Sequence, residues 1–437
     1  MSEMRTADLI AEVLQSLGIK RAHIAARQPE DWHDFIASHR QYIASLTLIG
    51  PGLVLSDALK NLGPRLMVVS GDQSPNDELV LKAMKDLPTA TFVPLDNLAT
   101  MLWTDIVADR LDVVSPAMSS HLSRSGPADE VVQLTSTQGE IAGITYNMQG
   151  SGPPLVLLPL GLSPSQWDPI LPNLQETYCT IVLTGPKLGI IPLLEERGTS
   201  AGYIRLMRRM IDEMAPKAGE SILDIGCGSG VVDRWLAKYT QGANPIVSLD
   251  VNAYLLQEAE KLTAAQGYSD SIDFRQGNAE ALPFSDNAFD LVFSTTVMEE
   301  VDADVMLNEM IRVAKPGGRI GVNVRALDLP RVVNVPVKPE LKSTLEAPQG
   351  TMEDKGCADA SLYRRFHAAG LNNVQMMPDL TVFSDPKGTV AGLLDRILVS
   401  EMDGAGVAAW QTSKAEAIAD GSFFLTWPHH CAVGTKL

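Results

Sequence analysis

The chain has 437 residues and carries 35 Lys plus Arg against 53 Asp plus Glu, which gives a formal net charge of -18. This length is about three times that of a typical domain and predicts at least two hydrophobic cores. The composition is 45% hydrophobic and 20% charged, with 34 Gly and 27 Pro, and it excludes a disordered, collagen-like or coiled-coil chain. The negative charge repels polyanions and therefore argues against nucleic acid or an anionic membrane as a partner.

The cysteines are far apart and form no C-x-x-C pair, and no histidine lies at a spacing suited to zinc. They are Cys179, Cys227, Cys357 and Cys431. We expect reduced core thiols and no metal site. No stretch reaches the roughly 18 apolar residues of a membrane span, and the polar start at Met1 predicts no targeting segment, so a cytoplasmic location is the expectation.

Helix-like segments and short apolar runs alternate through the first 120 residues. An amphipathic helix is predicted from Ala7, with Thr6 as its cap and Gly18 at its end. Strands are predicted at Ala22 to Ala26, Leu46 to Ile49, Leu66 to Val69 and Thr91 to Val93, with helices around Trp32 to Tyr42, Glu78 to Lys85 and Met101 to Leu111. Such alternation predicts a parallel sheet covered on both faces.

A polar stretch from Ser123 to Ala128 predicts a small boundary near residue 125. Further strands are predicted at Val131 to Leu134, Ile141 to Tyr146, Leu155 to Leu158 and Thr180 to Leu183, with a helix start at Pro164 to Trp167. The Gly- and Pro-rich stretch from Pro186 to Pro192 is interpreted as a linker. We therefore predict one α/β domain over residues 1–190 and a second over residues 197–437.

A glycine-rich loop follows a buried strand in the second half of the chain. The strand Ile222 to Ile225 leads into Asp224-x-Gly226-x-Gly228-x-Gly230, and a helix begins at Val231. Glycines let a ligand lie against the backbone, and helix N-terminal amides favour negative charge. A tight turn between strand and helix is the structural alternative.

Three later segments favour a ligand site over a simple turn. Asp250 ends an apolar strand 26 positions after Asp224, near the spacing at which a carboxylate binds ribose hydroxyls. Asn278 and Ala279 follow the strand Ile272 to Arg275 and precede an apolar Leu282 to Phe284, which we expect to form a lid. A fourth strand, Phe289 to Phe293, and the turn Lys315 to Gly318 before a fifth complete the pattern.

These motifs resemble the class I S-adenosylmethionine-dependent methyltransferases, in particular the small-molecule branch with the ubiquinone and menaquinone C-methyltransferases. The resemblance runs from about Arg197 to Leu437 and implies a Rossmann-like, seven-stranded sheet with S-adenosylmethionine as cofactor. It also implies that Phe423 to Leu425 and Cys431 to Val433 form the closing hairpin. The implied cofactor contacts are Asp224, Gly226, Cys227, Gly228 and Gly230 at the methionine part, Asp250 with Val251 at the ribose, Asn278 and Ala279 at the adenine, and Thr295 or Thr296 facing the ligand.

Two positions depart from the family pattern. Asn278 stands where Asp is commoner, which turns an acceptor-only contact into a mixed one. Glu299-Glu300 stands where many relatives have Glu-His, so no role of that histidine can be transferred. An NAD-linked dehydrogenase is the competing interpretation of the glycine loop, and the Asp-x-Gly-x-Gly-x-Gly form argues against it.

The predicted reaction is direct in-line transfer of a methyl group to a small-molecule nucleophile, giving S-adenosylhomocysteine. Thiols and neutral amines need little help, whereas an alcohol or carbon acid needs a base. The acceptor-side candidates are Tyr203, Arg208, Glu300, Arg325, His429 and His430. Their structural alternatives are helix packing for Tyr203 and Arg208, a solvated helix start for Glu300, an ion pair for Arg325 and an exposed turn for the histidines.

The segments from Val333 to Gly356 and from Val390 to Ile418 are expected to shape the acceptor pocket. A non-catalytic protein that binds S-adenosylmethionine for regulation or interaction is the alternative function. The sequence leaves the oligomeric state open, with a homo-oligomer as one option.

The first 190 residues resemble an α/β-hydrolase whose halves occur in swapped order. Ser2 to Ser120 matches the second half and Glu130 to Pro186 the first, so we expect the strand Leu155 to Leu158 to lie beside Ala22 to Ala26 in one sheet. Ala26-Arg27-Gln28-Pro29-Glu30 replaces the Gly-x-Ser-x-Gly elbow, and Leu158-Pro159-Leu160 replaces the oxyanion-hole loop. The resemblance therefore implies a hydrolase-like domain without a nucleophile.

Overall fold

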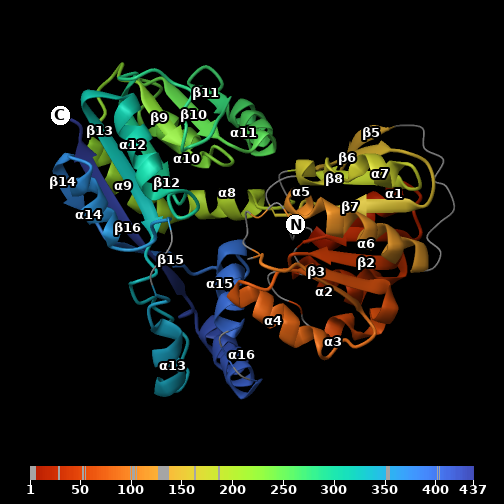
Figure 1. Cartoon of the computed structure of the whole chain (residues 1–437). Coiled ribbons are helices and arrows are strands. Elements are labelled where there is room, and N and C mark those ends of the chain that lie inside the picture. The colour runs from red at the N-terminus through yellow and green to blue at the C-terminus, as the bar shows by residue number, and fades with distance from the viewer. Residues whose placement is uncertain are drawn as a thin grey trace. The chain divides into compact units, whose positions relative to one another are not determined.

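The computed structural model describes the chain apart from residues 1–5, 28–29, 52–53, 55, 99, 101–103, 105, 126–136, 162–163, 186–187, 351–354, 401 and 403. The chain divides into two compact units, Met1–Pro192 and Leu193–Leu437. Each unit holds one sheet with both parallel and antiparallel strands, together with helices (Figure 1). Gln28, Pro29 and the predicted strand at Val131 to Leu134 lie outside the described residues.

The described residues of the N-terminal unit form eight strands in one sheet, in the order β4-β3-β2-β1-β7-β8-β6-β5. Their bounds are β1 Ala22–Ala26, β2 Ile43–Ile49, β3 Leu66–Ser70, β4 Thr91–Pro94, β5 Gln138–Ile141, β6 Ile144–Gln149, β7 Pro154–Leu157 and β8 Cys179–Thr184. Neighbouring strands from β4 to β8 are parallel, whereas β6 is antiparallel to both β8 and β5. The four central parallel strands β1, β2, β3 and β7 are buried along their whole length, as expected for a sheet covered on both faces.

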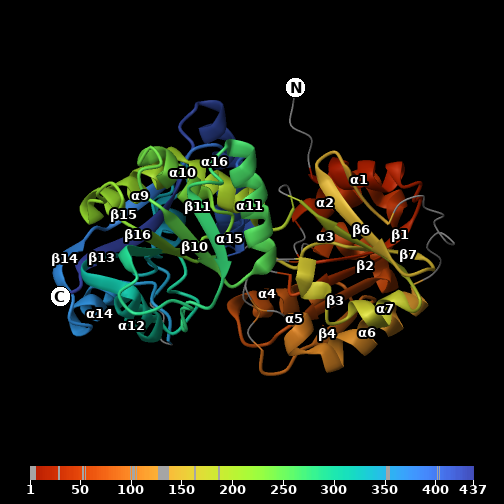
Figure 2. The same cartoon turned by 90° about the horizontal axis from the view of Figure 1, so that it is seen from above.

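Helices cover both faces of this sheet (Figure 2). The helices are α1 Thr6–Ser16, α2 Glu30–His39, α3 Ser56–Leu59, α4 Pro75–Met84, α5 Ile106–Asp109, α6 Leu111–Arg124 and α7 Leu171–Gln175, with 3-10 turns η1 Arg40–Tyr42, η2 Lys60–Arg65 and η3 Pro164–Trp167. The first four contribute to one hydrophobic cluster and the last three helices to another. The predicted two-layered cover is confirmed.

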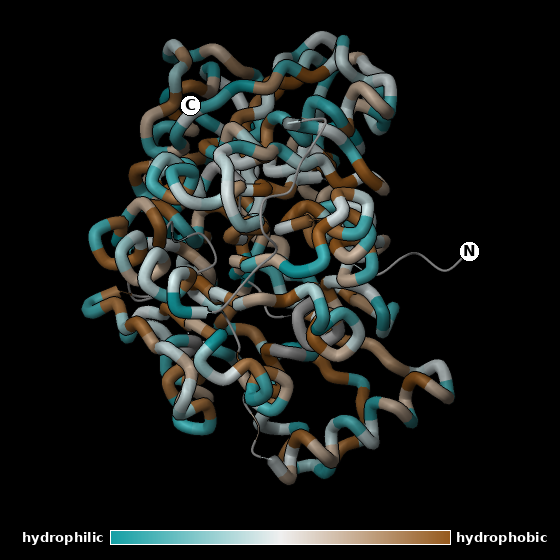
Figure 3. The backbone as a smooth tube through the Cα atoms, turned by 90° about the vertical axis from the view of Figure 1, so that its right-hand side faces the viewer, coloured by the Kyte–Doolittle hydropathy of each residue, from teal (hydrophilic) through white to brown (hydrophobic). Residues whose placement is uncertain are grey.

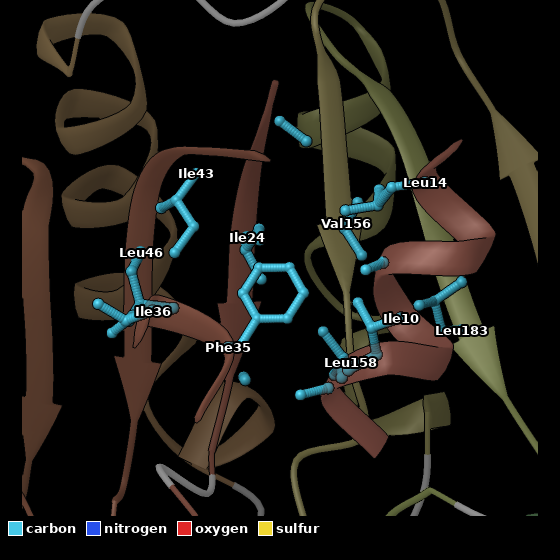
Figure 4. Packing of buried hydrophobic residues seen from close by; sticks show 14 of the residues in the cluster. Ile10, Leu14, Ile24, Phe35, Ile36, Ile43, Leu46, Val156, Leu158 and Leu183 are labelled. Carbon is cyan, nitrogen blue, oxygen red and sulfur yellow. The ribbon is translucent and has the colours of Figure 1, made fainter. Parts of the chain in front are cut away.

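The predicted junction between the two halves of this unit is also confirmed. Strand β1 pairs in parallel with β7, with Ile24 opposite Val156. Ile10 and Leu14 of α1 point toward Val156 and neighbouring residues of the second half (Figure 4). Residues that are far apart in the sequence therefore share one core.

Two predictions for this unit are wrong. The run from Ile141 to Tyr146 is not a single strand, because Ala142 and Gly143 both have positive φ, 53° and 81°, and form the turn between β5 and β6. Two consecutive residues with φ > 0 match the twist of a two-residue hairpin. The predicted polar boundary also begins too early, because α6 continues through Ser123 to Arg124.

Two buried histidines make the N-terminal unit sensitive to acid. Burial lowers the pKa of His23 and of His121 to about 4 each, and His23 Nδ1 lies 2.7 Å from Ser45 Oγ. As the pH falls from 6.5 to 4, both histidines become protonated in the unfolded chain but stay largely neutral in the folded unit. We therefore expect the free energy of unfolding to fall by up to about 1.4 kcal/mol per pH unit for each histidine.

Hydrogen exchange of peptides that contain β1, measured between pH 7 and pH 4.5 and corrected for intrinsic rates, checks this expectation. His23→Gln should flatten the pH dependence, and the exposed His367→Gln is the matched control. An unchanged slope in His23→Gln would contradict the assignment.

The C-terminal unit also contains one sheet, with strands in the order β11-β10-β9-β12-β13-β16-β14 and β15 beside β16. Their bounds are β9 Ile222–Ile225, β10 Ile246–Asp250, β11 Ile272–Gln276, β12 Phe289–Thr295, β13 Ala314–Arg325, β14 Asn372–Met376, β15 Asp379–Phe383 and β16 Leu425–Thr435. The five strands from β11 to β13 are parallel, and β16 is antiparallel to β13, β14 and β15. The implied sheet of seven strands is present, and β15 adds an eighth.

The described residues of this unit form nine helices, seven of which pack in three hydrophobic clusters. They are α8 Ile191–Thr199, α9 Ala201–Met214, α10 Val231–Tyr239, α11 Ala253–Gln266, α12 Ala303–Val313, α13 Pro339–Glu346, α14 Ser361–Ala368, α15 Thr389–Ser400 and α16 Gly404–Ala419. Helices α9 and α10 pack in one hydrophobic cluster and α12 and α14 in another, while α13, α15 and α16 form a third with the start of β16. The segment predicted as helix-like from Val390 to Ile418 is thus two helices.

The predicted closing hairpin is wrong in its details. Residues Cys431 to Val433 lie within the single long strand β16, and Phe423 precedes it. This strand pairs with β13 on one side and with β14 and β15 on the other, so it is an interior strand. Hydrophobic and hydrophilic stretches are interspersed along the tube in Figure 3, and no helix among the described residues is long and apolar enough to span a membrane.

Candidate functional site

The glycine loop joins β9 to α10 along a path that side chains would block. Gly226, Gly228 and Gly230 have φ of 78°, 56° and 70°. The amides of Gly226 and Cys227 both donate to the Leu249 carbonyl of β10, at 2.7 and 3.0 Å. A Cβ at position 226 would lie 2.1 Å from Cγ2 of Val297. The loop therefore has backbone amides close to β10 and needs glycine at this close approach.

Asp250 lies beside the loop and orders it. Its Oδ2 accepts a hydrogen bond from the Gly228 amide and its Oδ1 one from the Asn252 amide, both at 2.9 Å. Burial raises the pKa of the Asp250 carboxyl, which is 8% exposed, whereas the adjacent Val251 is 66% exposed. An exposed apolar side chain beside a buried acid is the surface that a nucleoside would cover.

Asp224 is turned into the protein, toward a second acid that the sequence interpretation missed. Asp224 and Asp233 of α10 are 2% and 0% exposed. Burial raises the pKa of Asp224 well above its usual value, and the charges of Asp233 and Asp250 raise it further. Burial also raises the pKa of Asp233, to about 6. Asp224 Oδ1 and both carboxyl oxygens of Asp233 have no hydrogen-bond partner among the described residues, which agrees with a proton held by this buried pair of acids.

Helix α8 is connected to the glycine loop through Arg234 of α10. Glu195 forms an ion pair with Arg234 of α10 at 2.6 Å, and Arg234 Nη1 donates to the Ser229 carbonyl at 2.6 Å. The next residue, Glu196, accepts hydrogen bonds from the amides of Thr389 and Val390 at the start of α15. The sequence interpretation missed these residues because each contact joins distant segments, and only the acidic pair in α8 gave a signal.

The segment predicted to flank adenine has a different arrangement from the expected lid. Asn278 is exposed, and its Oδ1 accepts a hydrogen bond from the Glu280 amide at 2.9 Å, while Ala279 is 8% exposed. Leu282 belongs to the hydrophobic core and Phe284 packs against it, edge-on to Phe289. Leu282 and Phe284 therefore pack with the core and do not form the expected lid, because apolar side chains gain more from burial there than over an open site, whereas Pro283 is exposed.

Tyr203 and Thr295 lie together at the carboxyl end of β12. The Tyr203 hydroxyl donates to Thr295 Oγ1 at 3.1 Å, and the side chain is fully buried. The Arg197 guanidinium lies over the Tyr203 ring, 5.1 Å from its centre, and His429 meets the ring edge-on. Thr296 adopts φ of 55°, a conformation that costs a non-glycine residue energy and reverses the chain as it leaves β12.

Glu299, Glu300 and Arg325 form a charged group at the same edge. Glu299 Oε1 accepts from the Arg325 amide at 2.8 Å and from Arg325 Nε at 3.3 Å. Glu300 Oε1 lies 4.0 Å from Arg325 Nη2. Burial raises the pKa of Glu300 to about 7, with Arg325 opposing the shift and Glu299 adding to it. Glu300 can thus gain or lose a proton near neutral pH.

Some buried polar atoms of three side chains around this edge lack hydrogen-bond partners among the described residues. Both amide atoms of Asn323 are unpaired, as are Nδ1 of His429 and Oε2 of Glu299. These side chains are at most 2% exposed. Buried polar groups are nearly always paired with protein or water, so this edge is suited to hold polar ligand atoms or water.

Four of the acceptor-side candidates lie together in the structure. Tyr203, Glu300, Arg325 and His429 come together, and burial followed by the charges of Arg197 and Arg325 lowers the pKa of His429 to about 3. The exposed turn given as the structural alternative for the histidines is wrong, since both lie in the interior strand β16 and His430 Nε2 bonds Asp328 at 2.7 Å.

Arg208 and Cys227 are not part of this group of acceptor-side residues. Arg208 is exposed, pairs with Asp212 and lies over the ring of Tyr239, which agrees with its structural alternative. Burial raises the pKa of the Cys227 thiol. No group of three His, Cys, Asp or Glu side chains suited to a metal ion occurs in the part of the chain that the structure describes.

Comparison with known proteins supports the resemblance of this unit to methyltransferases. Residues 223–322 match a family model described as a methyltransferase domain. The chain is 42% identical over 123 residues to the ubiquinone/menaquinone biosynthesis C-methyltransferase UbiE of Hahella chejuensis, which covers 28% of this chain and 49% of that protein. It is 32% identical over 190 residues to methyltransferase phqN of Penicillium fellutanum, covering 42% of this chain and 58% of that protein.

Among solved structures, the YcgJ protein from Bacillus subtilis matches with 18% identity and a TM-score of 0.38, covering 53% of this chain and 98% of that chain. The chain spans about half the length of the curated relatives it matches. The resemblance to class I methyltransferases, derived from the motifs, is confirmed for the C-terminal half by the family model and these relatives.

Proposed function

We propose, from the premise that residues 223–322 form a methyltransferase domain, that this protein transfers a methyl group from S-adenosylmethionine to a small molecule. The observation that carries the proposal is the buried Asp250 carboxylate hydrogen-bonded to the loop amide of Gly228. The carboxylate and the glycine loop together place an acceptor of hydroxyl hydrogen bonds at the carboxyl edge of parallel strands, where such folds bind ligands.

The residues fit the methyl donor in shape and charge. Asp250 would hold the ribose, the exposed Val251 would cover the nucleoside, and the loop around Gly226, Cys227, Gly228 and Gly230 would lie against the methionine part. Asn278, Ala279 and Thr295 are proposed to complete the pocket. When bound, the donor supplies a methyl group already activated on a sulfonium, so the protein needs chiefly to orient the acceptor and exclude water.

The acceptor side favours a molecule that must lose a proton. Glu300, with its pKa near 7, is suited to take that proton on a carboxylate oxygen. The guanidinium of Arg325, held by Glu299, would stabilise the negative charge that the acceptor develops. We therefore propose a carbon or hydroxyl acid as acceptor in preference to a thiol or amine. A non-catalytic role as a donor-binding regulator has no separate observation in its favour.

Labelled S-adenosylmethionine, incubated with the full chain and a panel of phenols, enolisable carbonyl compounds, amines and thiols, tests this proposal. We expect labelled product and S-adenosylhomocysteine in equal amounts, with phenols or enols as the reactive members. Donor binding without turnover of any panel member would favour the non-catalytic alternative.

Methyl transfer is also expected to survive removal of divalent ions. The spacing of the cysteines and histidines in the sequence offers no metal site, and the donor needs no Lewis acid to activate its methyl group. The rate after treatment with EDTA should equal the untreated rate. A rate that EDTA abolishes and Mg²⁺ or Zn²⁺ restores would overturn this expectation.

For the N-terminal unit we propose an inactive hydrolase-like fold with its halves exchanged. The support is the strand order, in which β6 runs opposite to all the other described strands of the sheet. At the end of β1, Arg27 is 4% exposed and donates to the carbonyls of Gly50, Thr104 and Leu160. This buried guanidinium fills the position beside which a nucleophile would act, so we expect no turnover of activated esters. Location in the cytoplasm stays a prediction, and a homo-oligomer stays one option.

A further inference from the structure

Helix α8 brings Arg197 to the glycine loop. Leu194 of this helix approaches the loop so closely that a Cβ at Gly228 would lie 3.0 Å from its Cδ1. One residue after Arg197, a Cβ at Gly198 would overlap Cγ1 of Val231, the first residue of α10. Arg197 stands between these two contacts in the sequence, so this turn of α8 lies beside the loop that is proposed to hold the methionine part.

The junction between α8 and α9 brings the Arg197 side chain to Tyr203. The Ser200 hydroxyl donates to the Arg197 carbonyl at 2.8 Å and accepts from the Tyr203 amide at 3.4 Å. The Arg197 guanidinium lies over the Tyr203 ring, 5.1 Å from its centre. Because the Tyr203 hydroxyl bonds Thr295 at the carboxyl end of β12, the guanidinium lies at the same edge of the sheet as the proposed acceptor group.

The Arg197 guanidinium has no hydrogen-bond acceptor and no ion pair among the residues that the structure describes, and its Nε is buried. Arg234 and Arg325 at the same site each pair with a glutamate. The Tyr203 ring attracts the positive charge but leaves the five N–H donors without an oxygen acceptor. Because buried guanidinium groups are nearly always paired, Arg197 is suited to bind an anionic group of a ligand.

The nearby titratable groups leave the charge of Arg197 unmatched. Burial raises the pKa of Glu300 to about 7, and Arg197 is among the positive charges that oppose this shift. Burial, followed by the charges of Arg197 and Arg325, lowers the pKa of His429 to about 3. Near pH 7 His429 is therefore neutral and Glu300 carries only part of a negative charge. An anionic ligand would supply the missing negative charge.

We propose that Arg197 binds a carboxylate group of a ligand in the methyl-transfer site. This inference rests on the proposed function, and the carboxylate has two possible sources, the amino-acid part of the methyl donor or an acid group of the acceptor. The planar guanidinium matches both oxygens of a carboxylate. The contacts of α8 with the glycine loop favour the donor, and the experiment separates the two sources.

Calorimetric titration of the full chain with S-adenosylhomocysteine and with decarboxylated S-adenosylhomocysteine tests the donor as the source. The second compound differs from the first only in lacking the carboxylate. We expect the wild type to bind S-adenosylhomocysteine at least about 10-fold more tightly than the decarboxylated compound, which is the usual contribution of hydrogen bonds between charged groups. Arg197→Gln should remove most of this preference, and Arg197→Lys should keep part of it because it retains the charge without the planar fork.

Titration of the complex with S-adenosylhomocysteine tests the acceptor as the source. The probes are para-hydroxybenzoate and phenol, which differ by one carboxylate. If the acceptor supplies the acid group, Arg197→Gln binds S-adenosylhomocysteine as tightly as the wild type does. The wild-type complex then binds para-hydroxybenzoate at least about 10-fold more tightly than phenol, and Arg197→Gln loses that preference.

Arg364→Gln removes an exposed arginine of α14 and is the matched control, which should behave like the wild type in both titrations. The comparison of paired probes on the wild type does not depend on the folding of any variant. If the wild type binds S-adenosylhomocysteine but Arg197→Gln matches it for both the donor compound and para-hydroxybenzoate, this proposal alone is overturned. A wild type that does not bind S-adenosylhomocysteine would overturn the proposed function together with this proposal.

Discussion

Replacing Asp250 with Ala is expected to weaken the binding of S-adenosylmethionine by about 1.5 to 3 kcal/mol, or roughly 10- to 150-fold, which is the usual cost of losing hydrogen bonds to a charged group. The variant loses the proposed ribose contact. It also releases the Gly228 amide from the carboxylate that accepts its hydrogen bond, so the glycine loop loses part of its order. Calorimetry with S-adenosylmethionine and with S-adenosylhomocysteine should show losses of similar size, because neither contact involves the sulfonium charge.

Two further variants separate these effects. Asp250→Asn keeps one oxygen for a backbone amide and should lose less affinity than Asp250→Ala. Asp273→Ala removes an exposed acid from the adjacent strand β11, where it pairs only with Arg275 among the described contacts, and should bind like the wild type. Equal affinity in the wild type and Asp250→Ala would remove Asp250 from the site.

Glu300→Gln is expected to lower kcat about 10²- to 10⁴-fold for an acceptor that must be deprotonated, which is the usual contribution of a general base. In the wild type, kcat should rise with pH and level off above about 7, because Glu300 accepts a proton only after it has lost its own. The variant should lack this dependence. Donor affinity should change little, since the side chain is proposed to face the acceptor.

The control variants for Glu300 distinguish loss of the general base from a change in the charge or packing around it. Glu213→Gln removes an exposed glutamate of α9 and should keep both the rate and the pH profile. Glu299→Gln loosens Arg325 and should lower the rate. It should keep an inflection due to Glu300, which moves to lower pH because the negative charge of Glu299 no longer raises the pKa of Glu300. The assignment of Glu300 as base fails if its Gln variant retains that inflection with the same acceptor.

Patterns local in the sequence predicted the C-terminal sheet well. The glycine loop and the strand-end acid at Asp250 could be read because each depends on a short run of residues and on a fixed strand-helix-strand unit. The contacts that hold that loop in place could not be predicted from the sequence. Arg234 pairs with Glu195, 39 positions away. Asp233 of α10 raises the pKa of Asp224 on β9. Contacts of this kind depend on packing, which no local pattern records.

The histidines at 429 and 430 show a second limit. Pro428 and two polar residues resemble a turn, and proline is normally confined to strand edges or bulges. The strand β16 nevertheless continues through them, because pairing with both β13 and β15 satisfies the backbone on either side. Burial of polar side chains in such a strand is a tertiary effect, and it brought His429 to the site.

The pairing of β1 with β7 has a consequence for synthesis of the protein. His23 lies opposite Leu155, 132 positions later, so the N-terminal sheet has high contact order and folds slowly for its size. At elongation rates of about 5–20 residues per second, the ribosome needs on the order of 10 s between these strands. During that interval the edge of β1 that later pairs with β7 is unpaired, so the nascent chain is exposed to aggregation.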